Sequence, residues 1–265
     1  MLPECKELLL DLAEGVLTIT LNRPQKRNAM NSALVKEMMA VFDSIYDDRS
    51  VRAVVLQGAE GTFCAGGDIS GMNDGEADVS PEQAAWNFNR SFGHMITQVN
   101  SAPQVVITLL EGAVLGGGFG LACISDVAIA DKNAMLSMPE TGLGIIPAQI
   151  APFVVARIGL TQARRLALLG ERVDGEAATQ LGIAHYLTEG REAMNAQLAE
   201  VLKKVRRCAP QANADTKTLM LQVGVVEHET LLDGAADMFS ASLRRDEGQE
   251  GTKAFMEKRK PFWAQ

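Results

Sequence analysis

Two glycine-rich segments are the features of this sequence with the clearest chemical use. Gly61–Asp68 reads Gly-Thr-Phe-Cys-Ala-Gly-Gly-Asp, and Gly112–Leu121 reads Gly-Ala-Val-Leu-Gly-Gly-Gly-Phe-Gly-Leu. Glycine allows positive φ and lets a ligand approach the main chain closely. Where such a turn opens a helix, its free backbone N–H groups point outward and favour negative charge. Two such turns facing each other would present two donors to one oxygen, which is the arrangement of an oxyanion hole.

Other interpretations of these segments follow from the same residues. Taken singly, each segment is better explained as a tight turn between a strand and a helix. The second segment is not a dinucleotide-binding fingerprint, because Gly116-Gly-Gly-Phe-Gly120 lacks the G-x-G-x-x-G spacing. The sequence contains no P-loop either.

The surrounding sequence predicts that both turns follow buried strands. Apolar runs at 8–12 and 16–21, separated by Ala13-Glu14-Gly15, predict a β-hairpin. The segments 51–56 and 104–110, directly before the two glycine turns, predict strands, and shorter strands are expected at 127–130 and 134–138. Helices are expected at 33–47, capped by Asn31 or Ser32, and at 84–100. This alternation favours an α/β fold with crossover connections.

After residue 160 the pattern changes to helices alone. Leu, Ala and Met recur at helical spacing in six segments, 161–169, 174–181, 192–207, 211–223, 228–245 and 248–258. We therefore expect a core over residues 1–195 and a helical C-terminal region over 196–265. This C-terminal region has too few apolar residues to form a core of its own, so it is expected to pack on the core or on a neighbouring subunit.

Composition excludes several classes of function. The 265 residues include 25 Lys and Arg against 33 Asp and Glu, which gives a net charge of −8. This balance, without a basic cluster, argues against a nucleic-acid or anionic membrane surface. Four cysteines and three histidines show no metal-ligand spacing. No membrane span or signal peptide is recognised, so the expectation is a cytoplasmic enzyme without a metal.

Together the motifs resemble the signature turns of a known family. Phe63-Cys-Ala-Gly-Gly-Asp68, Gly116-Gly-Gly118 and Pro139-Glu-Thr-Gly-Leu-Gly144 are similar to those of the enoyl-CoA hydratase/isomerase (crotonase) superfamily. Asn22-Arg-Pro24, Arg27-Asn-Ala-Met30 and Phe255-Met-Glu-Lys-Arg-Lys260 support the resemblance. It implies a crotonase (ClpP-like) ββα-spiral core with a helical C-terminal trimerisation region. It also implies a homotrimer or a dimer of trimers and an acyl-CoA substrate, with coenzyme A entering as part of that substrate and no separate cofactor.

The resemblance also assigns roles to residues. The backbone N–H groups of Gly67 and Gly117 would hold the thioester oxygen, and Glu140 would transfer protons. The residues expected along the coenzyme A path are Lys26, Arg27, Ala29, Ala65, Asp68 and Ile69. An enolate places negative charge on the thioester oxygen, so two donors at that atom would make the adjacent carbons reactive.

One departure from the family narrows the reaction. Family hydratases usually carry a further glutamate where this sequence has Gly120. Related isomerases and dehalogenases carry an acid where Ala148 and Gln149 stand, and neither residue can act as a base or nucleophile. A standard two-glutamate hydratase and those two chemistries are therefore disfavoured.

A subgroup matches better. Gly118-Phe-Gly-Leu121, the segment 144–155 and the segment 163–172 are similar to 3-methylglutaconyl-CoA hydratase relatives, which include the isohexenylglutaconyl-CoA hydratases of citronellol and geraniol breakdown. The predicted reaction is hydration of isohexenylglutaconyl-CoA to a 3-hydroxyglutaryl-CoA product. The alternatives are 3-methylglutaconyl-CoA hydration in leucine catabolism, or a CoA-binding relative with another lyase or isomerase activity. An RNA-binding relative would need a basic helix, which the charge disfavours.

The acyl pocket is predicted only in outline. Candidates for an apolar channel are the segment 145–155 and the side chains of Met72, Trp86, Phe88, Phe92 and Met95. Arg90 or Gln149 is expected to meet the substrate's distal carboxylate. Without an acid at position 120, the attacking water would rely on a backbone carbonyl, on Gln149 or on that carboxylate.

Overall fold

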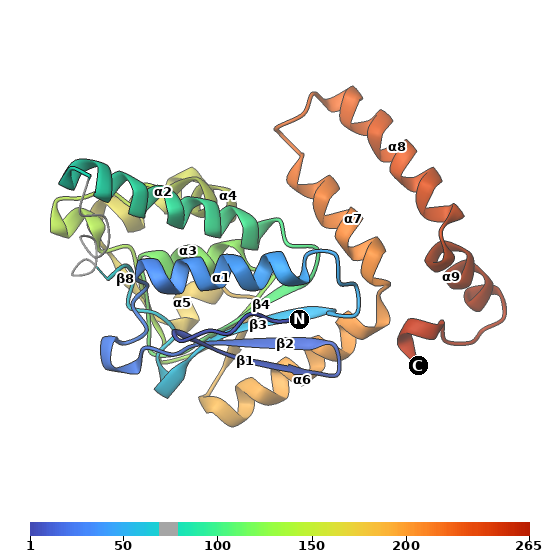
Figure 1. The fold of residues 1–265 in the computed structure, drawn as a ribbon, viewed down its shortest axis with the longest axis horizontal. Helices are drawn as coiled ribbons and strands as arrows, with labels where there is room; N and C mark the ends of the chain where they lie inside the picture. Colours follow the sequence, from blue (N-terminus) through green and yellow to red (C-terminus); the bar gives the residue numbers. More distant parts are fainter. Residues whose placement is uncertain (69–78) are drawn as a thin grey trace.

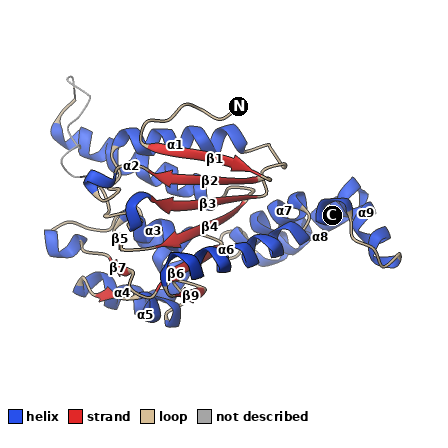
Figure 2. Ribbon diagram, turned by 90° about the horizontal axis from the view of Figure 1, so that it is seen from below, coloured by secondary structure: helices blue, strands red, loops and turns tan. Residues whose placement is uncertain are grey.

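A twisted six-stranded sheet forms the centre of the molecule (Figures 1 and 2). The computed structural model describes residues 1–68 and 79–265, so Ile69 and Met72 lie outside the described residues. The sheet order is β1-β2-β3-β4-β6-β9. Its strands are β1 (Leu8–Ala13), β2 (Val16–Leu21), β3 (Ala53–Gly58), β4 (Val105–Leu110), β6 (Val127–Asp131) and β9 (Tyr186–Thr188). β1 and β2 pair antiparallel, and the remaining pairs are parallel.

A second, smaller sheet contains the strands that follow β4 and β6 along the chain and one later strand. It consists of β5 (Ala113–Leu115), β7 (Met135–Ser137) and β8 (Arg172–Val173), in the order β5-β7-β8. Twice in succession, at β4-β5 and at β6-β7, the chain thus places one strand in the large sheet and the next in the small sheet before the following α-helix. This ββα repeat is the spiral expected from the sequence, and the second glycine turn lies at one of its corners.

Helices cover both faces of the large sheet because its strands are buried on both sides. Val54 and Leu56 of β3 face a core shared with α1 (Ser32–Ile45), α2 (Pro81–Asn100), α3 (Gly117–Ile124), α4 (Ala151–Leu169) and α5 (Gly175–Gln180). Ala53 and Val55, which alternate with them, face α6 (Gly190–Arg207) on the other side. The two-residue period of a strand explains this division.

Local sequence signals account for several of these elements. Glu14 and Gly15 both have positive φ, as a two-residue hairpin turn requires. The Asn31 side chain accepts a hydrogen bond of 2.9 Å from the Leu34 N–H and caps α1, as predicted. Helix α4 is broken at Gly159 (φ 74°), so its second part corresponds to the predicted segment 161–169, whereas its first part, which begins at Ala151, was not predicted. Helix α3, directly after the second glycine turn, was not predicted as a helix.

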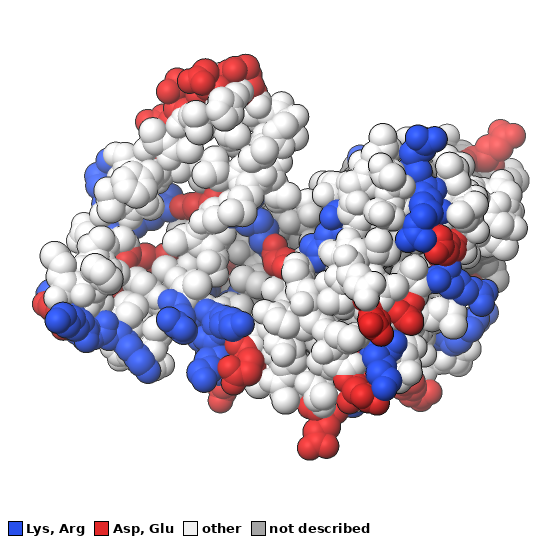
Figure 3. Space-filling model, turned by 180° about the vertical axis from the view of Figure 1, so that it is seen from behind, with Lys and Arg blue, Asp and Glu red and all other residues white. Residues whose placement is uncertain are grey.

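The C-terminal helices form an arm that stands away from the sheet (Figures 1 and 3). They are α7 (Pro210–Leu221), α8 (His228–Arg244) and α9 (Asp246–Met256). Helix α6 runs across residue 195, where the sequence suggested a division, and its Met194 and Val201 pack on the sheet. The arm exposes large apolar side chains, among them Val225 (81%), Phe239 (65%) and Phe255 (84%). No helix in the described part of the chain is long and apolar enough to cross a membrane.

Candidate active site

The two glycine turns lie side by side. The Cys64 N–H donates to the Ala113 carbonyl at 2.9 Å, and the Leu115 N–H donates to the Cys64 carbonyl at 2.8 Å. A Cβ placed on Gly116 would lie only 3.6 Å from the Cα of Gly66. Gly66 (φ 101°) and Gly116 (φ 50°) both adopt the backbone region that favours glycine. The residue type at these turns is therefore required by conformation and by close approach.

The N–H groups of Gly67 and Gly117 are free at this junction. The Met30 N–H donates to Gly66 O and the Asp68 N–H to Met30 O, both at 2.8 Å, so the intervening Gly67 N–H points away from that ladder. Gly117 is the first residue of α3, where helix geometry leaves an N–H without a partner. Neither N–H has a hydrogen-bond partner within residues 1–68 and 79–265. Both glycines line the same pocket.

Glu140 is a carboxylate in an apolar setting at this pocket. It begins the short 3₁₀ helix Glu140–Leu143, directly after Pro139. Its Oε1 lies 2.8 Å from where a Cβ on Gly116 would be, and its Oε2 is buried without a hydrogen-bond partner among the described residues. Burial raises the pKa of Glu140 above its usual range, although the backbone N–H of Glu140 itself opposes this shift. Such a group retains its proton more readily and can deliver it to a substrate.

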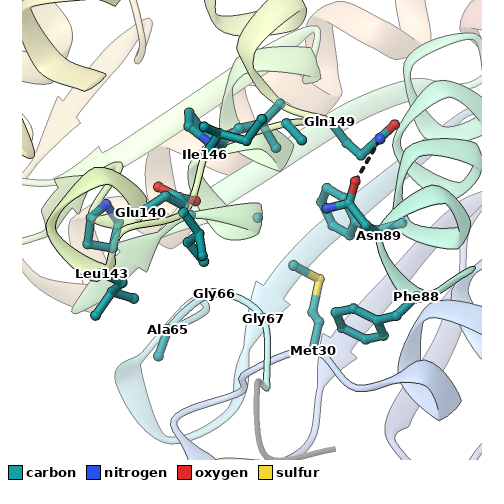
Figure 4. Close-up of a pocket in the computed structure, with 18 residues that line it drawn as sticks. Met30, Ala65, Gly66, Gly67, Phe88, Asn89, Glu140, Leu143, Ile146 and Gln149 are labelled. Carbon is teal, nitrogen blue, oxygen red and sulfur yellow. Dashed lines mark hydrogen bonds between the residues drawn. The ribbon is translucent and has the colours of Figure 1, made fainter. Parts of the chain in front are cut away.

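The pocket between these groups is small and mostly apolar (Figure 4). Its volume is about 200 Å³. Apolar side chains from α2, from the loop before α4 and from the N-terminal segment form its wall; these are Met30, Phe88, Phe92, Leu143, Ile145, Ile146 and Ile150. Among the described residues, three polar side chains reach it, Asn89, Glu140 and Gln149. An apolar pocket with few polar groups strengthens each electrostatic contact made inside it.

The space next to Gly120 is filled by neighbouring side chains, so position 120 has no room for an acid. A Cβ on Gly120 would lie 2.4 Å from Cγ2 of Ile150 and 3.0 Å from Cδ1 of Ile96. Ile150 thus occupies the space that a longer side chain at position 120 would need. A side chain at position 120 would therefore require Ile150 and Ile96 to shift, and among the described residues Glu140 is the only acid that lines the pocket.

The predicted coenzyme A residues that the structure describes lie together around the first glycine turn, but the Asp68 side chain is held in an ion pair. Lys26 and Arg27 are exposed, and the Ala65 N–H donates to the Arg27 carbonyl at 3.0 Å, which places Ala65 beside them. Ala29 is half-buried next to Met30. Asp68 is buried, and its Oδ2 lies 2.9 Å from a guanidinium nitrogen of Arg23. Its side chain therefore anchors the glycine turn, while the position of Ile69 lies outside the described residues.

The expectations for the acyl channel are met in part. Phe88, Phe92 and the segment 145–150 line the pocket, whereas Met95 is fully buried in the core. Trp86 is 63% exposed and does not line it. Arg90 does not line the pocket either, and its guanidinium contacts Gln149 instead. Asn89 lines the pocket but was not predicted; its place on α2 one turn before Phe92 is the signal that indicates it.

Buried Asn28, which lies in the Arg27-Asn-Ala-Met30 motif, is a second residue to which the sequence analysis assigned no role. Its Oδ1 accepts from the Arg23 N–H at 2.9 Å, and its Nδ2 donates to the carbonyls of Ala59 at 3.0 Å and Thr62 at 2.6 Å. Asn28 therefore ties the N-terminal segment to the first glycine turn. The described residues contain no cluster of His, Cys, Asp and Glu that could hold a metal ion.

Comparison with known proteins bears on the family of this chain. The family model described as enoyl-CoA hydratase/isomerase matches residues 11–265. The structure of Pseudomonas aeruginosa AtuE is 55% identical and superposes with a TM-score of 0.95, covering 98% of this chain and 100% of that one. The short-chain-enoyl-CoA hydratase of Clostridium acetobutylicum is 30% identical over 97% of both chains. The 2,3-dehydroadipyl-CoA hydratase of Escherichia coli is 28% identical over 96% of this chain and 97% of its own.

The chain belongs to the enoyl-CoA hydratase/isomerase family, and its fold is the crotonase fold. It is an enzyme of the enoyl-CoA hydratase type, a hydro-lyase that acts on CoA thioesters.

Proposed function

We propose that this enzyme hydrates a 3-branched glutaconyl-CoA, with isohexenylglutaconyl-CoA of acyclic terpene breakdown as its substrate and a 3-hydroxyglutaryl-CoA as its product. The observation that carries the proposal is that Glu140, whose Oε2 has no hydrogen-bond partner among the described residues, lies at the pocket while Ile150 fills the space that a second acid at position 120 would need. In a 3-branched substrate a second alkyl group on C3 stabilises the positive charge that develops there as the water oxygen bonds to it. A branched substrate therefore reduces the need for a second strong base.

In the proposed mechanism, Gly67 and Gly117 donate their N–H groups to the thioester oxygen. These donors draw electron density from the double bond and stabilise the enolate as it forms. Protonated Glu140 gives its proton to C2, and the water oxygen bonds to C3. The added water then loses one proton to the Glu140 carboxylate, which restores the acid form. The net change is addition of one water molecule across the double bond.

The apolar wall of the pocket supports a substrate with a hydrocarbon branch. Leu143, Ile145 and Ile146 line the pocket and remain 62%, 46% and 73% exposed. A hydrocarbon tail that covers these side chains would remove apolar surface from water, which contributes about 25 cal/mol per Å². The similarity of segments 144–155 and 163–172 to branched glutaconyl-CoA hydratases points to the same substrate class.

One relative acts, by its name, on a thioester with an acidic acyl group. 2,3-Dehydroadipyl-CoA, after which the Escherichia coli relative is named, is the thioester of a dicarboxylic acid. For the coenzyme A portion we propose Lys26, Arg27, Ala29 and Ala65 at the first glycine turn, with Ile69 following it. The exposed Lys26 and Arg27 carry the positive charge that a phosphate requires.

For the assembly we propose a homotrimer, alone or as a dimer of trimers. The support is the C-terminal arm, because side chains such as Val225 and Phe255 are more than four-fifths exposed on it. Exposed apolar surface of this extent is typical of subunit interfaces. Sedimentation of the purified protein measures the assembly directly, and a monomer at micromolar concentration would contradict it.

The experiment that tests the function compares three thioesters: crotonyl-CoA, 3-methylglutaconyl-CoA and isohexenylglutaconyl-CoA. Hydration is followed as loss of the enoyl-thioester absorbance. We expect turnover of the branched pair, with isohexenylglutaconyl-CoA preferred, and little turnover of crotonyl-CoA. A preference for 3-methylglutaconyl-CoA would reassign the substrate within the pair. Absence of turnover on all three, with coenzyme A still bound, would assign another lyase or isomerase reaction.

A further inference from the structure

Three polar side chains form a hydrogen-bonded series on the pocket wall opposite Glu140 (Figure 4). Arg90 of α2 donates from a guanidinium nitrogen to Gln149 Oε1 at 3.4 Å. Gln149, from the loop before α4, donates from Nε2 to Asn89 Oδ1 at 2.8 Å. Asn89 and Gln149 line the pocket, and Arg90 stands behind them. We refer to Arg90, Gln149 and Asn89 as the amide relay.

The chemistry of Arg90 fixes the direction of every bond in the amide relay. A guanidinium donates hydrogen bonds and never accepts them, so the Gln149 atom that faces it must be the oxygen. Gln149 then donates from its NH₂ group to Asn89, which must accept with its side-chain oxygen. The Asn89 NH₂ group is left as the end that faces the cavity (Figure 4), and it has no hydrogen-bond partner among the described residues.

The fold provides room for this arrangement at one glycine. A Cβ on Gly93 would lie 2.0 Å from Gln149 Oε1 and 2.6 Å from the Arg90 guanidinium. Gly93 lies within α2, where glycine weakens a helix by about 1 kcal/mol relative to alanine. The helix therefore bears a local cost at the one position where a side chain would exclude Gln149.

The free end of the amide relay suits an anionic oxygen better than a reacting water. Activation of water requires a base that takes its proton, and an amide is too weak a base for this; the group that Asn89 leaves free is a donor, because its oxygen accepts from Gln149. An N–H donor backed by a guanidinium attracts a carboxylate, and no Lys or Arg among the described residues lines the pocket to compete for it.

We propose that Asn89, held and polarised by Arg90 through Gln149, binds the second carboxylate of the acyl group and so selects acidic enoyl thioesters over neutral ones. This proposal rests on the proposed function, and it assigns the substrate contact to Asn89 instead of to Arg90 or Gln149. The donor sits across the cavity from Glu140, so the second carboxylate is drawn away from the Glu140 carboxyl group (Figure 4).

Binding of unreactive thioesters tests the proposal without any need for turnover. 3-Methylglutaryl-CoA and isovaleryl-CoA share the same branched chain and differ by one carboxylate in place of hydrogen. We expect the wild-type protein to bind the first about 10- to 100-fold more tightly, as a hydrogen bond to a charged group allows. Asn89→Leu should bring this ratio close to one. Arg90→Met should lower the ratio in part, and Arg90→Lys should restore some of it.

A matched control is Gln83→Ala, which removes an exposed hydrogen bond of 2.9 Å to Asn87 on the same helix. It should leave the binding ratio unchanged. A wild-type ratio near one, or a ratio that Asn89→Leu does not change, would overturn the proposal. An equal loss of affinity for 3-methylglutaryl-CoA and isovaleryl-CoA in Asn89→Leu would also overturn it, since that result indicates a structural role for Asn89. If the ratio behaves as expected but the branched enoyl thioesters are not hydrated, the proposed function fails and the carboxylate site stands.

Discussion

Deleting the Gly67 N–H by Gly67→Pro should reduce hydration about 10²- to 10³-fold. Loss of one oxyanion-hole donor typically costs about 2.7–4 kcal/mol of transition-state stabilisation. Gly67 is the suitable position for this test because its N–H bonds to no described residue, so proline removes no internal hydrogen bond. Gly117 is less suitable, since a Cβ there would lie 2.5 Å from Met30 Cε.

Gly67→Ala is the matched control for this change. Among the described residues, a Cβ at position 67 would meet only Phe88, at 3.9 Å, which is ordinary contact, and the N–H is retained. Turnover of isohexenylglutaconyl-CoA is measured for both variants, together with the thermal midpoint and the affinity for coenzyme A. We expect the alanine variant to keep most activity and the proline variant to lose it in kcat. Equal losses in both variants, or full activity in folded Gly67→Pro, would refute the assignment of Gly67 as an oxyanion donor.

Three further changes test the rest of the site. Gly120→Ala should destabilise the fold by about 1–3 kcal/mol, because its Cβ would lie 2.4 Å from Ile150 Cγ2; chemical denaturation should show that Ile150→Ala in the same chain restores part of that loss. Asp68→Ala should lower the free energy of unfolding by about 3 kcal/mol, since it breaks the buried ion pair with Arg23. We expect the low end of the range for such a pair because Glu7 still lies 3.0 Å from Arg23 Nε, and an unchanged thermal midpoint would contradict this. The pH profile should reflect the raised pKa of Glu140: its acid form persists above about pH 4.3, where an exposed glutamate is half ionised, so hydration declines as pH rises through the raised pKa. A flat profile across that limb would contradict acid catalysis by Glu140.

The sequence predicted the framework well because its signals are local. Glu14 and Gly15 indicate a hairpin turn, and Asn31 caps a helix, whatever the rest of the chain does. The two glycine turns were predicted to meet from their shared chemistry and from the family resemblance. Their contact at Gly66 and Gly116 bears out this part of the prediction.

The features of the site that the sequence did not predict depend on contacts between residues distant along the chain. The loss of an acid at position 120 is visible in the sequence, but its replacement by Ile150 depends on how the loop before α4 enters the pocket. Asn89 was missed for the same reason, since its role follows from Gln149, 60 residues further along the chain. Asp68 carries the family motif, yet its side chain meets Arg23, a pairing that no local pattern reveals.

The measurement that tests the central claim most directly is turnover of isohexenylglutaconyl-CoA by Glu140→Gln. The amide keeps the size of the side chain but cannot carry a proton to C2. We predict that the variant binds coenzyme A as the wild-type protein does while hydration falls about 10²- to 10⁴-fold, the usual contribution of a general acid or base. Turnover comparable to that of the wild-type protein would contradict a hydratase that works with Glu140 as its single carboxylate.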